Sequence, residues 1–124
     1  MVYEFLPAIR GHVRRRLTLW GWAGEHDEAT LIANELTTNA LNHGRVVNGL
    51  MVVRMALLGD GTLLIDVSDP LAAFPGFSVE RAPVGDDEER GRGLLLIQCL
   101  GGTPSWWLRA GGGKTVRVAL RSTR

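Results

Sequence analysis

The chain has 124 residues, of which 45% are hydrophobic and 22% are charged. This length suits one compact domain, residues 1–124, and is too short for two. The net charge of +1 gives no general electrostatic reason to expect binding to nucleic acid or to a membrane surface. The N-terminus lacks the pattern of a signal peptide and the single cysteine cannot form an internal disulfide, so we expect a cytoplasmic protein. That residue, Cys99, is expected to be a small buried hydrophobe.

Two helices are predicted in the first third of the chain, over residues 7–21 and from Asp27, as the N-cap, to His43. Their apolar stripes at helical spacing are Ile9, Val13, Leu17 and Trp20 in the first helix, and Ile32, Leu36 and Ala40 in the second.

Four strands and a short helix are predicted after the two helices. The strands cover residues 49–58, 62–69, 104–109 and 114–121, and the short helix runs from about Gly93 to Gly101. Asp60-Gly61 favours a hairpin between the first two strands. Residues 70–92 are rich in proline, glycine and acidic side chains, which indicates an irregular segment that could act as a lid. This order predicts an α+β fold, a two-layer sandwich with helices on one face of a mixed, largely antiparallel sheet.

Glu35 and Asn39 stand four residues apart in the second predicted helix, so they share one face. The Asn39 carbonyl oxygen is a suitable ligand for Mg²⁺, which takes few protein ligands when substrate phosphates supply the others. Glu35 can orient or deprotonate an attacking hydroxyl group or water. Two further features of the chain strengthen this otherwise common pair.

The first feature is Asp69, at the end of a predicted strand. It shares a strand face with Leu63, Ile65 and Val67, so its carboxylate points toward the helices and needs a partner there. An adenine amino group is a suitable donor. The alternative is that Asp69 only caps the turn at Pro70.

The second feature is the run Gly91, Arg92, Gly93 and Leu94, directly before the predicted short helix. Glycines allow the backbone to approach phosphate, and a helix N-terminus supplies unpaired N–H groups. A loop that simply ends at a helix cap is the alternative.

In this order, the three elements resemble the motifs of the GHKL superfamily of ATP-binding domains, which have the Bergerat fold. The stretches Ala33–Ala40 and Arg92–Ile97 are most similar to the anti-sigma factor serine kinases of actinobacterial type, the RsbW-like group. The resemblance implies ATP and Mg²⁺ as cofactors, Glu35 as catalytic base and Asn39 as the metal ligand. It further implies that Asp69 reads adenine and that the Gly91–Leu94 backbone lines the phosphates.

The sequence departs from the family pattern after Asp69. Pro70-Leu71-Ala72-Ala73 stands where the family usually has glycines, so side chains occupy positions at which the backbone normally approaches the nucleotide. The family's adenine-site threonine matches either Lys114 or Thr115. Strand parity with Val116 and Val118 favours Lys114, but the sequence assigns neither.

The resemblance implies an ATP-dependent serine/threonine protein kinase that acts in a partner-switching system. Its partners would be a sigma factor, an antagonist of the anti-sigma factor, or both, and a homodimer is also open. The alternative is a non-catalytic module, either ATP-binding or nucleotide-free, that works through protein contacts. The catalytic domain of a histidine kinase is less favoured, because Glu35 stands where that group usually carries asparagine.

Overall fold

The computed structural model describes residues 6–43, 51–69, 95–110 and 112–122. The helices are α1 (Leu6–Trp20) and α2 (His26–His43), and the strands are β1 (Val52–Leu57), β2 (Leu63–Asp69), β3 (Thr103–Leu108) and β4 (Lys114–Leu120). Residues 95–99 add a short helical segment. The predicted bounds agree to within three residues wherever they fall on described residues.

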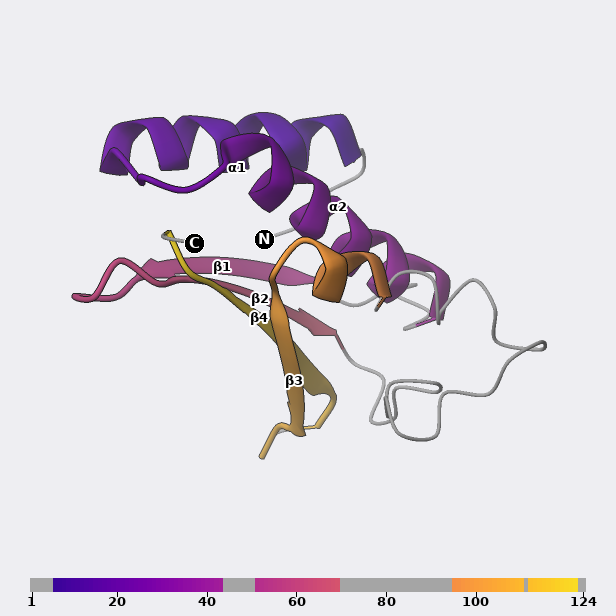
Figure 1. Ribbon diagram of the computed structural model, residues 1–124. Helices are drawn as coiled ribbons and strands as arrows, with labels where there is room; N and C mark the ends of the chain where they lie inside the picture. The colour runs from indigo at the N-terminus through magenta and orange to yellow at the C-terminus, as the bar shows by residue number, and fades with distance from the viewer. Residues whose placement is uncertain (1–5, 44–50, 70–94, 111, 123–124) are drawn as a thin grey trace.

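One sheet of four antiparallel strands forms the lower layer, in the order β1-β2-β4-β3. Both helices lie on the same side of this sheet (Figure 1). α2 packs against the two central strands, and α1 packs against α2. The predicted α+β sandwich is therefore confirmed, and every strand pair among the described residues is antiparallel.

The core fills the space between the two layers, as strand and helix periodicity require. The residues predicted to form the apolar stripes are all buried except Trp20, which is partly buried against the same cluster. The sheet contributes its inward-facing side chains, namely Val53, Leu63, Ile65, Val67, Val116, Val118 and Leu120.

The start of α2 differs from the prediction. The helix begins at His26, so Asp27 lies in its first turn rather than at the N-cap. Asp27 and Glu28 still place negative charge near the positive end of the helix dipole. Asp27 also accepts a hydrogen bond from Arg14 of α1 at 2.6 Å, but both side chains are mostly exposed and such pairs contribute little.

Trp22 connects the helical layer to the turn between β1 and β2. Its indole nitrogen donates to the carbonyl oxygen of Gly61, in the β1–β2 turn, at 2.9 Å. The ring packs so closely on Gly24 that a Cβ atom there would lie 2.3 Å from it. A glycine at position 24 is thus required by the buried tryptophan.

Gly102, just before β3, is a second position where the chain packs closely. Its neighbours are β4 and the short helical segment. A Cβ atom at this position would lie 2.7 Å from Val118 and 2.9 Å from Ile97. Both of these side chains are fully buried, so they have little room to move.

No helix among the described residues is long and apolar enough to cross a membrane.

We expect Gly102→Ala to lower the free energy of unfolding by about 1–3 kcal/mol, because the added methyl group overpacks the core beside Val118. Chemical denaturation measures this change. Gly59→Ala is the matched control, since a Cβ atom at Gly59 meets nothing within 4 Å. Equal effects of the two substitutions would contradict the close approach at Gly102.

Candidate functional site

Glu35 and Asn39 lie on α2, as predicted, one helical turn apart. Asn39 is buried at 7% exposure, and its amide nitrogen has no hydrogen-bond partner. An unpartnered buried polar group is costly and unusual in native proteins. Its presence here fits a position that binds a polar ligand.

Glu35 is half-buried. Within the described residues, the carboxylates of Asp27, Asp66 and Asp69 are held in ion pairs, whereas no ion pair holds Glu35. Glu35 is therefore an available acidic side chain on the same helix as the orphaned amide of Asn39.

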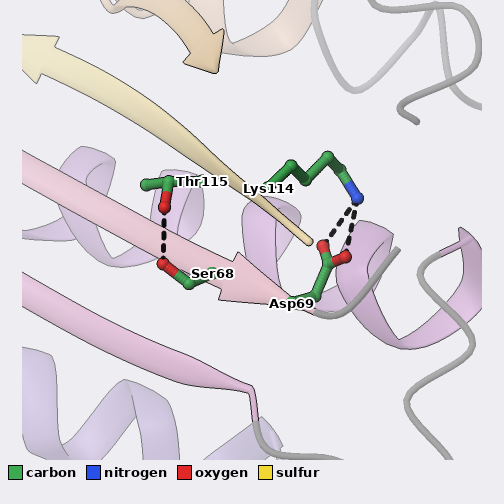
Figure 2. Close-up of polar contacts among 4 residues, drawn as sticks. All are labelled: Ser68, Asp69, Lys114 and Thr115. Atoms are coloured by element: carbon green, nitrogen blue, oxygen red, sulfur yellow. Dashed lines mark hydrogen bonds and ion pairs between the residues drawn. The ribbon is translucent and has the colours of Figure 1, made fainter. Parts of the chain in front are cut away.

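Asp69 lies at the end of β2 and is buried at 2% exposure, on the helix side of the sheet as its parity predicts. Its partner is Lys114, which stands directly opposite on β4. The ammonium nitrogen donates to both carboxylate oxygens, at 2.8 and 2.7 Å (Figure 2). The sequence correctly predicts the face and the need for a partner, but it does not predict this cation.

Thr115 lies on the opposite face of the sheet from Lys114. It pairs with Ser68, and the two hydroxyl oxygens are 2.7 Å apart (Figure 2). The structure thus separates the two candidate positions by sheet face, while the role of either residue toward adenine stays a prediction. Only Lys114 lies on the same side of the sheet as Asp69 and α2.

The outer face of the sheet carries a second charged pair. Arg117 donates to both oxygens of Asp66, at 2.8 and 2.9 Å, and this hydrogen bonding raises the pKa of Arg117. The guanidinium group also lies over the ring of Trp107, 5.0 Å from its centroid. Trp106 points the other way and packs against the core, so the two tryptophans divide as strand alternation requires.

The predicted phosphate-binding residues Gly91, Arg92, Gly93 and Leu94 lie outside the described residues, as does the predicted lid over residues 70–92. Their roles stay predictions, as do those of Glu35, Asn39 and Asp69 toward nucleotide and metal.

A hollow of about 620 Å³ lies at the other end of the sheet, lined by residues that include Trp22, Glu28, Cys99 and Arg121. It adjoins Leu120, at the end of β4 remote from Lys114. Six residue steps of a strand separate the two ends, about 20 Å, so this hollow is distinct from the pair of Asp69 and Lys114. Cys99 is exposed there, and the expectation that it is buried is wrong.

The model of the family described as the histidine kinase-like ATPase domain matches residues 4–120. The chain belongs to this family. No curated protein sequence matches the chain.

Two solved structures are similar in fold. The histidine kinase domain from the Erythrobacter litoralis EL346 blue-light activated histidine kinase aligns with a TM-score of 0.52 at 21% identity, covering 77% of this chain and 43% of that one. A structure of the Erythrobacter litoralis EL346 kinase aligns with the same TM-score and identity, covering 75% of this chain and 31% of that one. The chain thus spans less than half the length of either, and at this identity the likeness concerns the fold.

The described residues fit a nucleotide with Mg²⁺ in one respect and depart from the expected site in another. The orphaned Asn39 amide suits a bound polar group, since either end of an amide can face a ligand and its orientation follows from the hydrogen-bond network. The buried carboxylate of Asp69, by contrast, is already paired with the ammonium group of Lys114. A signal for this pair exists in the sequence, because Asp69 and Lys114 both share parity with inward apolar residues, but the strand register must be known to place them opposite each other.

We expect Lys114→Met to lower the free energy of unfolding by about 3–5 kcal/mol, because it removes the counter-charge of a buried carboxylate. The double substitution Asp69→Leu with Lys114→Met should recover most of this loss, since apolar side chains of similar volume replace buried ion pairs well. Chemical denaturation of the single and double variants measures both effects.

Asp66→Asn is the control for this cycle. It weakens the pair with Arg117, whose side chain is 37% exposed, and should cost about 1 kcal/mol or less. An equally small loss of unfolding free energy in Lys114→Met would show that an unpaired Asp69 carboxylate costs no more than the weakened pair of Asp66 and Arg117.

Proposed function

We propose that the chain is an ATP-binding regulatory protein that phosphorylates a partner protein on serine or threonine. The observation that carries the proposal is the arrangement on α2, where the available carboxylate of Glu35 stands one turn from the orphaned amide of Asn39. Membership of the histidine kinase-like ATPase family supports ATP as the ligand.

Each residue has a separate role in this proposal. The Asn39 carbonyl oxygen would hold Mg²⁺, whose charge would offset that of the phosphates. Gly91, Arg92, Gly93 and Leu94 supply backbone N–H groups, and the charge of Arg92, to the phosphate oxygens. Asp69 stands at the position proposed for the adenine base.

Glu35 acts as the general base of the transfer. Its carboxylate takes the proton of the partner's hydroxyl group while that oxygen forms a bond to the γ-phosphorus. The bond from the γ-phosphorus to the bridging oxygen breaks, and ADP leaves with the electron pair of that bond. The products are the phosphorylated partner, ADP and a proton on Glu35 that passes to water.

The partners proposed are those of an anti-sigma factor kinase, namely a sigma factor, its antagonist protein, or both, with a homodimer as a further arrangement. This part of the proposal rests on the motif resemblance at Ala33–Ala40 and Arg92–Ile97.

A second candidate function is a non-catalytic interaction module with the same fold. Two observations favour it: the ion pair that already engages Asp69, and the run Pro70-Leu71-Ala72-Ala73 in place of glycines. Transfer of labelled phosphate to a partner protein separates the two candidates.

Titration with Mg·ATP, followed by calorimetry, tests the nucleotide site before any partner is known. Wild-type protein should bind more tightly with Mg²⁺ than with EDTA, and Asn39→Ala should remove this difference because the metal loses its protein oxygen ligand. Asn34→Ala is the matched control on the same helix, since its side chain accepts from Arg10 of α1 instead. A Mg²⁺ effect that survives in Asn39→Ala would exclude this residue as the ligand.

Glu35→Gln should leave Mg·ATP affinity within about twofold but slow phosphate transfer on the order of 10²–10⁴-fold, because it removes the proton acceptor. The measurement is incorporation of γ-labelled phosphate into serine of an antagonist protein. Glu25→Gln, at an exposed carboxylate just before α2, should behave as wild type. Normal transfer by Glu35→Gln would rule out the general-base role.

A further inference from the structure

The buried pair of Asp69 and Lys114 sets this site apart from a simple carboxylate pocket. Both side chains are 1% exposed, and the ammonium nitrogen lies within 2.8 Å of each carboxylate oxygen. Figure 2 shows the nitrogen facing the two oxygens together, at the end of β2. Both oxygens that would accept from a ligand therefore already accept from the protein.

Stability alone does not account for the pair. Taking two charges out of water costs several kcal/mol per ion, and well-packed apolar residues usually serve a core equally well. The neighbouring cross-strand pairs of β2 and β4 show that uncharged residues also fill this sheet. Val67 packs opposite Val116 on the same face, and Ser68 meets Thr115 as a neutral pair on the other face.

We infer that Lys114 determines base specificity at this site, by occupying the carboxylate that would otherwise recognise the amino group of adenine. The inference rests on the proposed function, because it concerns the nucleotide bound beside α2. It makes Lys114 a specificity-determining residue that acts through Asp69.

The strengths of the competing hydrogen bonds support this assignment. Lys114 makes two bonds in which donor and acceptor are both charged, whereas an adenine amino group is neutral. A neutral amino group can reach only the remaining lone pairs of the two oxygens, and the ammonium group already balances their negative charge, so the added hydrogen bond is weaker than one to an unpaired carboxylate. The site therefore holds purine nucleotides through phosphate and metal contacts and gains little from the 6-amino group.

Calorimetric titration with two ligands tests this inference on the native chain. One ligand is Mg·ATP, and the other is the Mg²⁺ complex of purine riboside triphosphate, which lacks the 6-amino group. Wild-type protein should bind the two within about twofold of each other, because the amino group has no strong acceptor. A preference of tenfold or more for ATP would overturn the inference.

Lys114→Thr supplies the second measurement. With the ammonium removed, the carboxylate of Asp69 can accept from the base, and ATP should be preferred by about tenfold or more. Thr115→Val is the matched control, since it alters the neighbouring position on the opposite face and should leave the wild-type ratio unchanged. A ratio in Lys114→Thr equal to that of wild type would also overturn the inference.

The outcomes separate this inference from the function on which it rests. If wild-type protein and Lys114→Thr both fail to bind either ligand, the proposed function falls and the inference falls with it. If wild-type protein binds with a strong preference for ATP, only the inference falls. If Lys114→Thr does not fold, the comparison on wild-type protein still decides.

Discussion

The register between β2 and β4 is the constraint on which the rest of this structure depends. These two central strands place Leu63 opposite Leu120 at one end and Asp69 opposite Lys114 at the other. A slip of one residue would turn every inward side chain to the outer face. The helices would then lose the apolar surface they cover, and the buried carboxylate would lose its cation. The fold and the chemistry of the site are thus specified by the same pairing.

This register divides the polar residues of the sheet between two environments. On the inner face, Asp69 and Lys114 interact in surroundings from which water is excluded, where charges act strongly on each other. On the outer face, Asp66 and Arg117 form a similar bidentate pair with part of the guanidinium in water, and Trp107 covers it. The two ion pairs therefore have similar hydrogen bonds but different exposure to water. We propose a role in ligand recognition for the pair of Asp69 and Lys114 alone, because the pair of Asp66 and Arg117 lies on the face of the sheet away from the helices.

The two parts of the candidate site stand in contrast. On α2, the Asn39 amide lacks a partner and the Glu35 carboxylate is held by no ion pair in the described part of the chain, so this helix presents unused polar capacity. On β2, Asp69 already has a counter-ion. This contrast is the basis for our proposal that the site recognises metal and phosphate more strongly than the base. The two candidate functions differ in whether the Glu35 carboxylate and the Asn39 amide take part in phosphate transfer. The fold is compatible with a kinase and with a non-catalytic module.

The sequence by itself determined the elements, the fold class and the inward face of Asp69, because helical and strand periodicity are local properties of the chain. It missed the start of α2 at His26 and the exposure of Cys99, since caps and small residues depend on neighbours that periodicity does not specify. Parity favoured Lys114 over Thr115 but could not show what Lys114 contacts. Only the tertiary structure decided that, because residues 45 apart in sequence meet through strand pairing, and pairing register is a property of the assembled sheet.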